Sequence, residues 1–255
     1  MPASFNHRCN RMDFQQMLGD AFSYTREGII GNLNRWLKLV LAVLCLGIPF
    51  NGYIMRIYRG ENPAPEADQW GTLFVDGLKL LCVGIVYAIP LIILWGILYV
   101  PFFLGIINGT LDESALETWE PNFLLMMVFY IVEIAVAIIM PVASIRFART
   151  GSFSEAFNFS AILSTIGRIG WISYIVAYIL VSLVIGIPVF ILVMGAIILG
   201  AALLVLMSGA GMIAFVALLV LAVLLMLVLS PVFGVFQARY MTRVYDSAVP
   251  AEPVS

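Results

Sequence analysis

The chain has 255 residues, of which 62% are apolar and 11% are charged, and its mean hydropathy is +1.04. Soluble domains carry about 25% charged residues, so this composition excludes a soluble globular protein, a disordered chain and a disulfide scaffold. With 13 basic and 15 acidic residues, the net charge of −2 also excludes an ordinary nucleic-acid binder. The class that remains is an integral membrane protein.

The N-terminal 35 residues contain several arginines and no apolar core, so they do not have the pattern of a secretory signal. Met12 is a second plausible start of the chain. We therefore expect residues 1–11 to be a dispensable extension, residues 12–245 to be a single membrane domain, and residues 246–255 to be a disordered tail.

Long uncharged runs define the expected membrane segments. A helix needs about 20 mostly apolar residues to cross the hydrocarbon of a bilayer. The uncharged runs hold 17 residues after Lys38, 32 after Lys79, 25 after Glu120 with one interruption, and 70 after Arg168. A single helix of 70 residues would be about 105 Å long, so the last run must fold back. The expected segments are residues 37–57, 79–106, 122–145, 169–194 and 211–237.

Two parts of this map stay open. Residues 195–207 are too short to cross alone, so they either extend the preceding helix or form a re-entrant piece. The segment 37–57 has basic residues on both sides. It either crosses fully, which places the N-terminus outside, or is re-entrant and breaks near Gly47–Pro49.

The distribution of lysine and arginine predicts the orientation. The loop 108–121 has four acidic residues and no basic residue, whereas every lysine and arginine lies in the other flanks. We expect the basic flanks and the C-terminus to be cytoplasmic and the loop 108–121 to be extracytoplasmic.

Three segments end in the same way, with a proline followed after five to eight residues by two arginines spaced three or four apart. That spacing places both guanidinium groups on one helix face. We expect them to anchor the helix at the membrane boundary by reaching anionic head groups. The pairs are Arg56 with Arg59, Arg146 with Arg149, and Arg239 with Arg243.

A stripe of apolar residues at every fourth position also recurs, within residues 14–22, 70–78 and 153–161. This spacing predicts one face of a helix. The three stripes are either amphipathic helices in the membrane plane or extensions of the membrane helices. Together with the arginine pairs they divide the chain into three related units, residues 12–60, 66–151 and 152–245. The predicted fold is all-α, a polytopic transmembrane bundle of about five or six segments with amphipathic interfacial helices.

Three stretches carry a family resemblance: Gly52-Tyr-Ile-Met-Arg56, Trp70-Gly-Thr-Leu-Phe-Val-Asp-Gly-Leu-Lys79, and Ile85-Val-Tyr-Ala-Ile-Pro90. They resemble the pattern of an uncharacterised membrane family of archaea and bacteria, domain of unknown function 4013. The resemblance covers roughly residues 12–245 and is strongest over 50–90. It implies a polytopic helical protein of a prokaryotic cell membrane and implies no activity.

The sequence offers little catalytic chemistry. His7 is the one histidine, so no histidine-based metal constellation forms within the chain, and no nucleotide-binding or hydrolase motif is present. We expect no catalytic residue, no metal and no cofactor. Glu133 is the exception, because it interrupts an apolar run near its middle, where an ionised carboxylate costs at least about 2.5 kcal/mol. We expect it to face the bundle interior, either as a coupling site or as a protonated hydrogen-bond donor.

The leading functional hypothesis is a non-enzymatic integral membrane protein with a structural, lipid-associated or assembly role. Its expected partners are membrane lipids and a homo-oligomer or membrane complex, and no nucleic acid. The alternative is a small-solute or ion transporter or channel that uses Glu133. A membrane enzyme acting on lipid is the third and weakest hypothesis.

Overall fold

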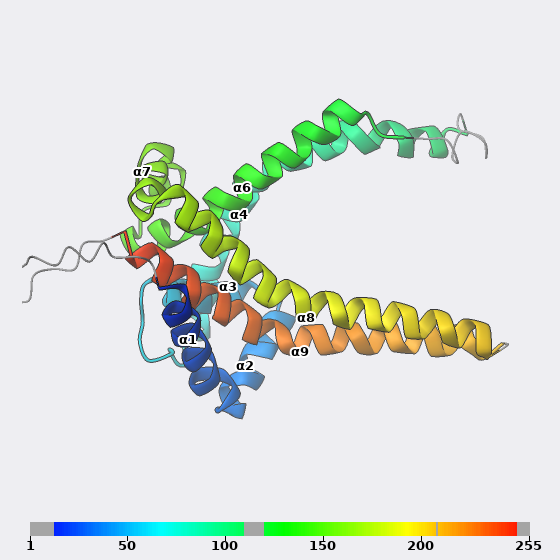
Figure 1. Cartoon of the computed structure of the whole chain (residues 1–255), viewed down its shortest axis with the longest axis horizontal. Coiled ribbons are helices and arrows are strands. Elements are labelled where there is room, and N and C mark those ends of the chain that lie inside the picture. The colour runs from blue at the N-terminus through cyan, green and yellow to red at the C-terminus, as the bar shows by residue number, and fades with distance from the viewer. Residues whose placement is uncertain (1–12, 110–119, 208, 249–255) are drawn as a thin grey trace, which may run out of the picture.

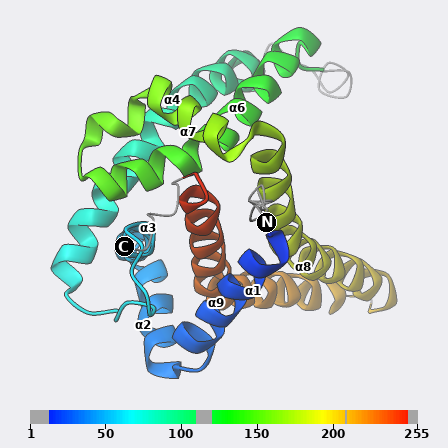
Figure 2. The same cartoon turned by 60° about the vertical axis from the view of Figure 1, so that its left-hand side comes forward.

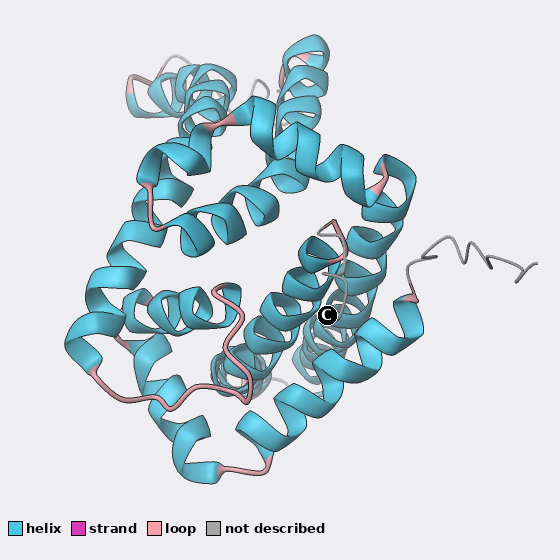
Figure 3. Cartoon of the chain, turned by 90° about the vertical axis from the view of Figure 1, so that its left-hand side faces the viewer, coloured by secondary structure: helices cyan, strands magenta, loops and turns pink. Residues whose placement is uncertain are grey.

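The computed structural model describes residues 13–109, 120–207 and 209–248, and these residues are helical with short connections (Figure 3). The expected extension 1–11, most of the loop 108–121 and most of the tail 246–255 lie outside the described residues. The all-α prediction is confirmed for the part of the chain that the structure describes.

Four long helices form two antiparallel hairpins. The first pairs α4 (Trp70–Ile107) with α6 (Phe123–Thr150), and the second pairs α8 (Trp171–Leu206) with α9 (Gly211–Asp246). All four are long and apolar enough to cross a membrane. The hairpins share a packed region at one end, which we call the head, and diverge toward their tips (Figure 1).

Short helices complete the head, and together with α4, α6 and α8 they surround the last turns of α9 (Figure 2). They are α1 (Phe14–Thr25), η1 (Arg26–Ile30), α2 (Leu33–Leu44), α3 (Ile48–Tyr58), η2 (Phe153–Phe157) and α7 (Phe159–Ile169). Asparagine or aspartate side chains cap the N-termini of several of these helices. Asp13 accepts a hydrogen bond from the Gln16 amide at the start of α1, and Asn158 accepts one from the Ala161 amide at the start of α7.

The hydrophobic core lies in the head. Fully buried side chains there include Tyr53 of α3, Ile145 of α6, Tyr174 of α8 and Val235 of α9. Toward the tips the helices contact mainly their hairpin partners, and large apolar side chains are exposed along both hairpins. A soluble protein seldom exposes so large an apolar surface, and lipid is the solvent that suits it.

In three places the structure decides between the alternatives that the sequence left open. Residues 37–57 do not form one crossing helix, because the chain breaks after α2, where Leu46 and Gly47 both adopt left-handed backbone angles. Residues 70–78 continue into α4 instead of forming a separate in-plane helix, and residues 195–207 extend α8.

The expected stripe 153–161 is also divided. Asn158 lies between η2 and α7 and accepts a hydrogen bond from the Ala161 amide, so α7 begins there as a separate helix. The stripe of residues 14–22 is confirmed as part of α1, with Phe14 and Leu18 packed against the core.

Candidate functional site: the arginine layer and the pocket between α4 and α6

The six arginines of the repeated pairs come together in the head, and each binds an acidic side chain of the same chain. We call this set, with its carboxylate partners, the arginine layer. Arg56 of α3 binds the Asp68 carboxylate at 3.1 Å and also donates to the Glu66 carbonyl, and Arg59 binds Asp76 of α4 at 2.7 Å. These contacts fasten α3 to the beginning of α4 and to the loop before it.

The α6 pair reaches three other elements. Arg146 forms an ion pair with Glu155 of η2, and the hydrogen bond from Arg146 holds the pKa of that carboxyl below its usual value. Arg149 binds Asp246 of α9 at 2.8 Å and donates from Nε to the Tyr58 carbonyl at 2.6 Å. Arg149 therefore joins the ends of α3, α6 and α9.

The α9 pair shares one carboxylate. Asp20 of α1 accepts hydrogen bonds from Nε of Arg239 at 2.7 Å and from Arg243 at 2.5 Å. These hydrogen bonds outweigh the desolvation of the carboxyl and lower the pKa of Asp20 from 3.8 to about 2. Arg239 is only 3% exposed and also lies over the Tyr24 ring, 4.3 Å from its centroid.

The structure gives the arginines internal partners, and their expected anchoring at lipid head groups stays a prediction. Lipid head groups were the predicted partners, but a guanidinium that already binds a carboxylate has few free donors for phosphate. Among the described residues, Arg26, Lys38 and Arg168 form no ion pair with an acid of this chain. Arg26 and Arg168 are exposed and Lys38 is half-buried, so these three bases have charge that no acid of the described chain neutralises.

Sequence reasoning missed the carboxylates that complete the layer: Asp20, Asp68, Asp76, Glu155 and Asp246. Their spacing from the arginines along the chain ranges from nine to 223 residues, so no local pattern marks them. Two buried polar atoms in the same region have no hydrogen-bond partner among the described residues, Nε of Arg146 and the hydroxyl of Tyr240.

In two membrane helices, an aromatic side chain donates a hydrogen bond to a backbone carbonyl close to a proline. Proline lacks an amide hydrogen and opens the helical hydrogen-bond pattern around it. The Tyr174 hydroxyl donates to the Ile138 carbonyl at 2.6 Å, three residues before Pro141. In the same way the Trp36 indole donates to the Val228 carbonyl at 2.9 Å, three residues before Pro231. Proline itself removes the amide partner of the carbonyl four residues before it, so these two bonds add a donor to the neighbouring carbonyl and tie α8 to α6 and α2 to α9.

Glu133 does not face the interior of the chain. Its side chain is exposed on α6, and none of the described residues forms a hydrogen bond or ion pair with it. The expectation of an interior position is therefore wrong for the single chain. The physical reason is the divergence of the hairpins, since α8 meets α6 through Tyr174 nearer the head and leaves this part of α6 uncovered.

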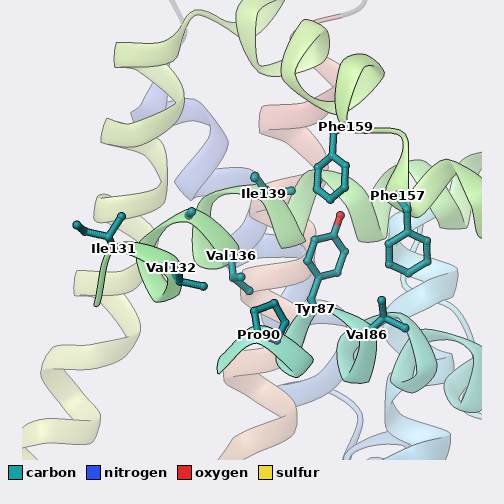
Figure 4. Close-up of a pocket in the computed structure, with 10 residues that line it drawn as sticks. Val86, Tyr87, Pro90, Ile131, Val132, Val136, Ile139, Phe157 and Phe159 are labelled. Atoms are coloured by element: carbon teal, nitrogen blue, oxygen red, sulfur yellow. The ribbon is translucent and has the colours of Figure 1, made fainter. Parts of the chain in front are cut away.

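A pocket of about 270 Å³ lies between α4 and α6 where η2 closes its head end (Figure 4). Its walls are apolar apart from Tyr87, and the Tyr87 hydroxyl is already engaged, because it donates to the Ala156 carbonyl at 2.6 Å. Phe157 stacks on the Tyr87 ring at 5.5 Å between centroids. The lining residues are Val86, Tyr87, Pro90, Ile131, Val132, Ala135, Val136, Ile139, Phe157 and Phe159.

The pocket offers no acid, base or nucleophile to a bound molecule. In the described part of the chain, no cluster of three histidine, cysteine or acidic side chains could hold a metal ion. What the pocket can do is accept an apolar group of modest size, because its volume is near the lower end of the roughly 300–1,000 Å³ range of small-molecule sites.

Comparisons with known proteins give one match. A family model described as a protein of unknown function (DUF4013) matches residues 37–197, more than half of the chain. The match includes the quoted stretches between Gly52 and Pro90 and ends before α9 begins. No curated protein and no solved structure matches the chain. The chain is therefore a member of the DUF4013 family, whose function is unknown.

Proposed function

We propose that this protein is a non-enzymatic integral membrane protein with a structural, lipid-associated role. One observation carries the proposal. The charged groups of the head neutralise one another in the arginine layer, whereas the hairpins and the pocket between α4 and α6 present apolar surface to their surroundings. An apolar pocket that opens between two membrane helices suits the acyl chain of a lipid.

Lipid cross-linking tests this proposal. The purified protein in vesicles is exposed to a phospholipid that carries a photoactivatable group in its acyl chain, and the modified peptides are identified by mass spectrometry. We expect labelling of the pocket walls, and we expect Ala135→Trp to abolish it by filling the pocket. Ala202→Trp, on an exposed part of α8 far along the other hairpin, is the matched control and should leave pocket labelling unchanged. Equal labelling in wild type and Ala135→Trp would contradict lipid binding in the pocket.

The orientation that accompanies this proposal places the head on the cytoplasmic side of a prokaryotic cell membrane, as the lysine and arginine asymmetry favours. Single cysteines at Glu120, near the hairpin tip, and at Ser154, in the head, test it with an impermeant thiol reagent on intact cells. The first should react directly and the second only after lysis. The opposite pattern would reverse the orientation.

A transporter or channel is the second candidate, and one observation favours it. Glu133 is an exposed carboxylate without a partner in the described chain, in the middle of an apolar helix. Ionisable groups within membrane segments commonly serve in ion or proton pathways. Glu133→Gln separates the two functions, because glutamine keeps a hydrogen-bonding amide but cannot exchange a proton. Normal insertion with loss of the cellular phenotype would favour transport, and full complementation of a deletion strain would exclude coupling through Glu133.

A further inference from the structure

The helix α2 has an exposed leucine face. Leu33, Leu37, Leu41 and Leu44 recur at intervals of three or four residues and are all more than half exposed. Leu39 and Ala42, on the opposite side, are buried against the head. The polar residues Asn34 and Lys38 lie between these two faces, which is the pattern of a helix at a membrane surface.

The chain on both sides of α2 and α3 is fastened to the same end of α9. Before them, Asp20 of α1 binds Arg243. After them, the carbonyl of Tyr58 binds Arg149, which in turn binds Asp246. Arg243 and Asp246 are one helical turn apart, so the segment between Asp20 and Tyr58 begins and ends at the same level of α9.

The turn between α2 and α3 also brings the chain back, toward the first turns of α4. Leu46 and Gly47 adopt φ angles of 59° and 70°, which end α2 and redirect the chain into α3. The helix α3 then packs tightly along the first turns of α4. A Cβ atom at Gly77 would lie 1.7 Å from the Ile48 carbonyl oxygen, so the two backbones approach closely. Leu46, at the turn, is 89% exposed.

The hydrogen bond of Trp36 fixes the level of α2 relative to α9. It reaches the carbonyl of Val228, where α9 leaves the core. On one side of this point Pro231 and Val235 are buried in the head, and on the other side Leu221 and Leu224 are exposed. The leucine face of α2 therefore continues the exposed apolar surface of α9. Tryptophan is enriched at this kind of boundary between hydrocarbon and water.

We infer that α2 and α3 form an interfacial hairpin that enters one leaflet and does not cross the membrane. The leucine face of α2 lies in the acyl chains of an anionic phospholipid leaflet, and the Lys38 ammonium, which no acid of the described chain neutralises, lies at the lipid phosphates. With four crossing helices, both ends of the chain are on the same side. The inference rests on the assignment of the chain to a membrane and is independent of the pocket.

Depth measurements test the position of the leucine face. Single cysteines replace Leu41, on that face, or Asn34, on the polar flank, in a chain whose native cysteines are serine, and each carries an environment-sensitive fluorophore in vesicles that contain anionic lipid. We expect nitroxide-labelled acyl chains to quench the fluorophore at Leu41→Cys, and aqueous iodide to quench the fluorophore at Asn34→Cys. Strong iodide quenching at both positions would overturn the inference.

Accessibility tests the absence of a crossing. Asn34, in the first turn of α2, and Glu61, after α3, are both exposed, and cysteines at these positions should react with an impermeant maleimide from the same side of the membrane. Reaction from opposite sides would show a full crossing and overturn the inference. The native Cys82, exposed on α4, is the control. If α4 crosses the membrane, Cys82 should stay unreactive whether or not the hairpin crosses. Reaction of Cys82 would show instead that the assignment to a membrane is wrong.

Discussion

The carboxylate of Asp20 in α1 accepts a 2.7 Å hydrogen bond from Nε of Arg239 in α9, 219 residues later in the chain. Arg239 is almost fully buried, and this carboxylate compensates the guanidinium charge. The contact joins the first helix of the described chain to the last one, and Arg243 strengthens it from the next turn of α9.

Asp20→Asn should therefore destabilise the protein strongly. Removing one member of a buried ion pair leaves an uncompensated charge and costs about 3–5 kcal/mol, and we expect the lower end of this range because Asp20 is partly exposed. Thermal unfolding in detergent, followed by circular dichroism, measures the change. Glu27→Gln, at an exposed position without an ion pair, is the control and should melt as the wild type does.

The lowered pKa of Asp20 predicts that the stability of the protein depends on pH. The pKa of Asp20 falls from 3.8 to about 2 in the folded protein, so the ionised form is favoured by folding. Its contribution to stability is complete above pH 3.8 and is lost as the pH falls toward about 2. The melting temperatures of wild type and Asp20→Asn should accordingly converge across this interval. A constant difference between the two proteins down to the lowest pH would contradict this linkage.

A charge swap distinguishes internal pairing from lipid anchoring of the arginines. Arg149→Glu alone should lower stability by about 1 kcal/mol, because it replaces an attraction to Asp246 with repulsion. The double variant Arg149→Glu with Asp246→Arg should recover most of the loss, as judged by melting temperature and by yield in membranes. An arginine that acted mainly on head groups would show no recovery in the double variant.

The close packing of α3 on α4 predicts that Gly77→Ala is disruptive. The new methyl group would lie 1.7 Å from the Ile48 carbonyl oxygen, so the helices must separate, and overpacking of this kind costs about 1–3 kcal/mol or more. Protease sensitivity of the connection between α3 and α4 measures the separation. Gly71→Ala, at a helical position in α4 with open space around it, should be neutral or stabilising.

The hydroxyl of Tyr174 allows the hydrogen bond between α8 and α6 near Pro141 to be tested. Tyr174→Phe removes the hydrogen bond to the Ile138 carbonyl and should cost about 0.6 kcal/mol, the average for interhelical side-chain hydrogen bonds in a membrane protein, and at most about 1.7 kcal/mol. Tyr130→Phe removes a hydroxyl from an exposed side chain on α6 and should have no effect on unfolding in the same detergent. Equal stability of both variants would show that the Tyr174 bond contributes nothing.

The sequence by itself determined the class of the protein and its long helices. Apolar runs without charge specify membrane helices because the bilayer excludes unpaired polar backbone, and each of the four long helices falls on a predicted run. Several ends lie well beyond the expected bounds, since α4 begins at Trp70 and α8 and α9 end at Leu206 and Asp246. The extension of α4 back to Trp70 was one of two alternatives, since a helical stripe has the same periodicity whether it lies in the plane or continues a crossing.

Only the tertiary structure decided how the charges are used. The arginine pairs were visible in the sequence, but their carboxylate partners lie on other helices, and a local pattern cannot show which of two charged groups will meet. The prediction that Glu133 faces the interior was wrong for the same reason, because the divergence of the hairpins determines which face of α6 is covered. The sequence left a break near Gly47 as one of two alternatives, and the tertiary structure decided for it, with α3 docked on α4 where Gly52 and Gly77 let the two backbones come close.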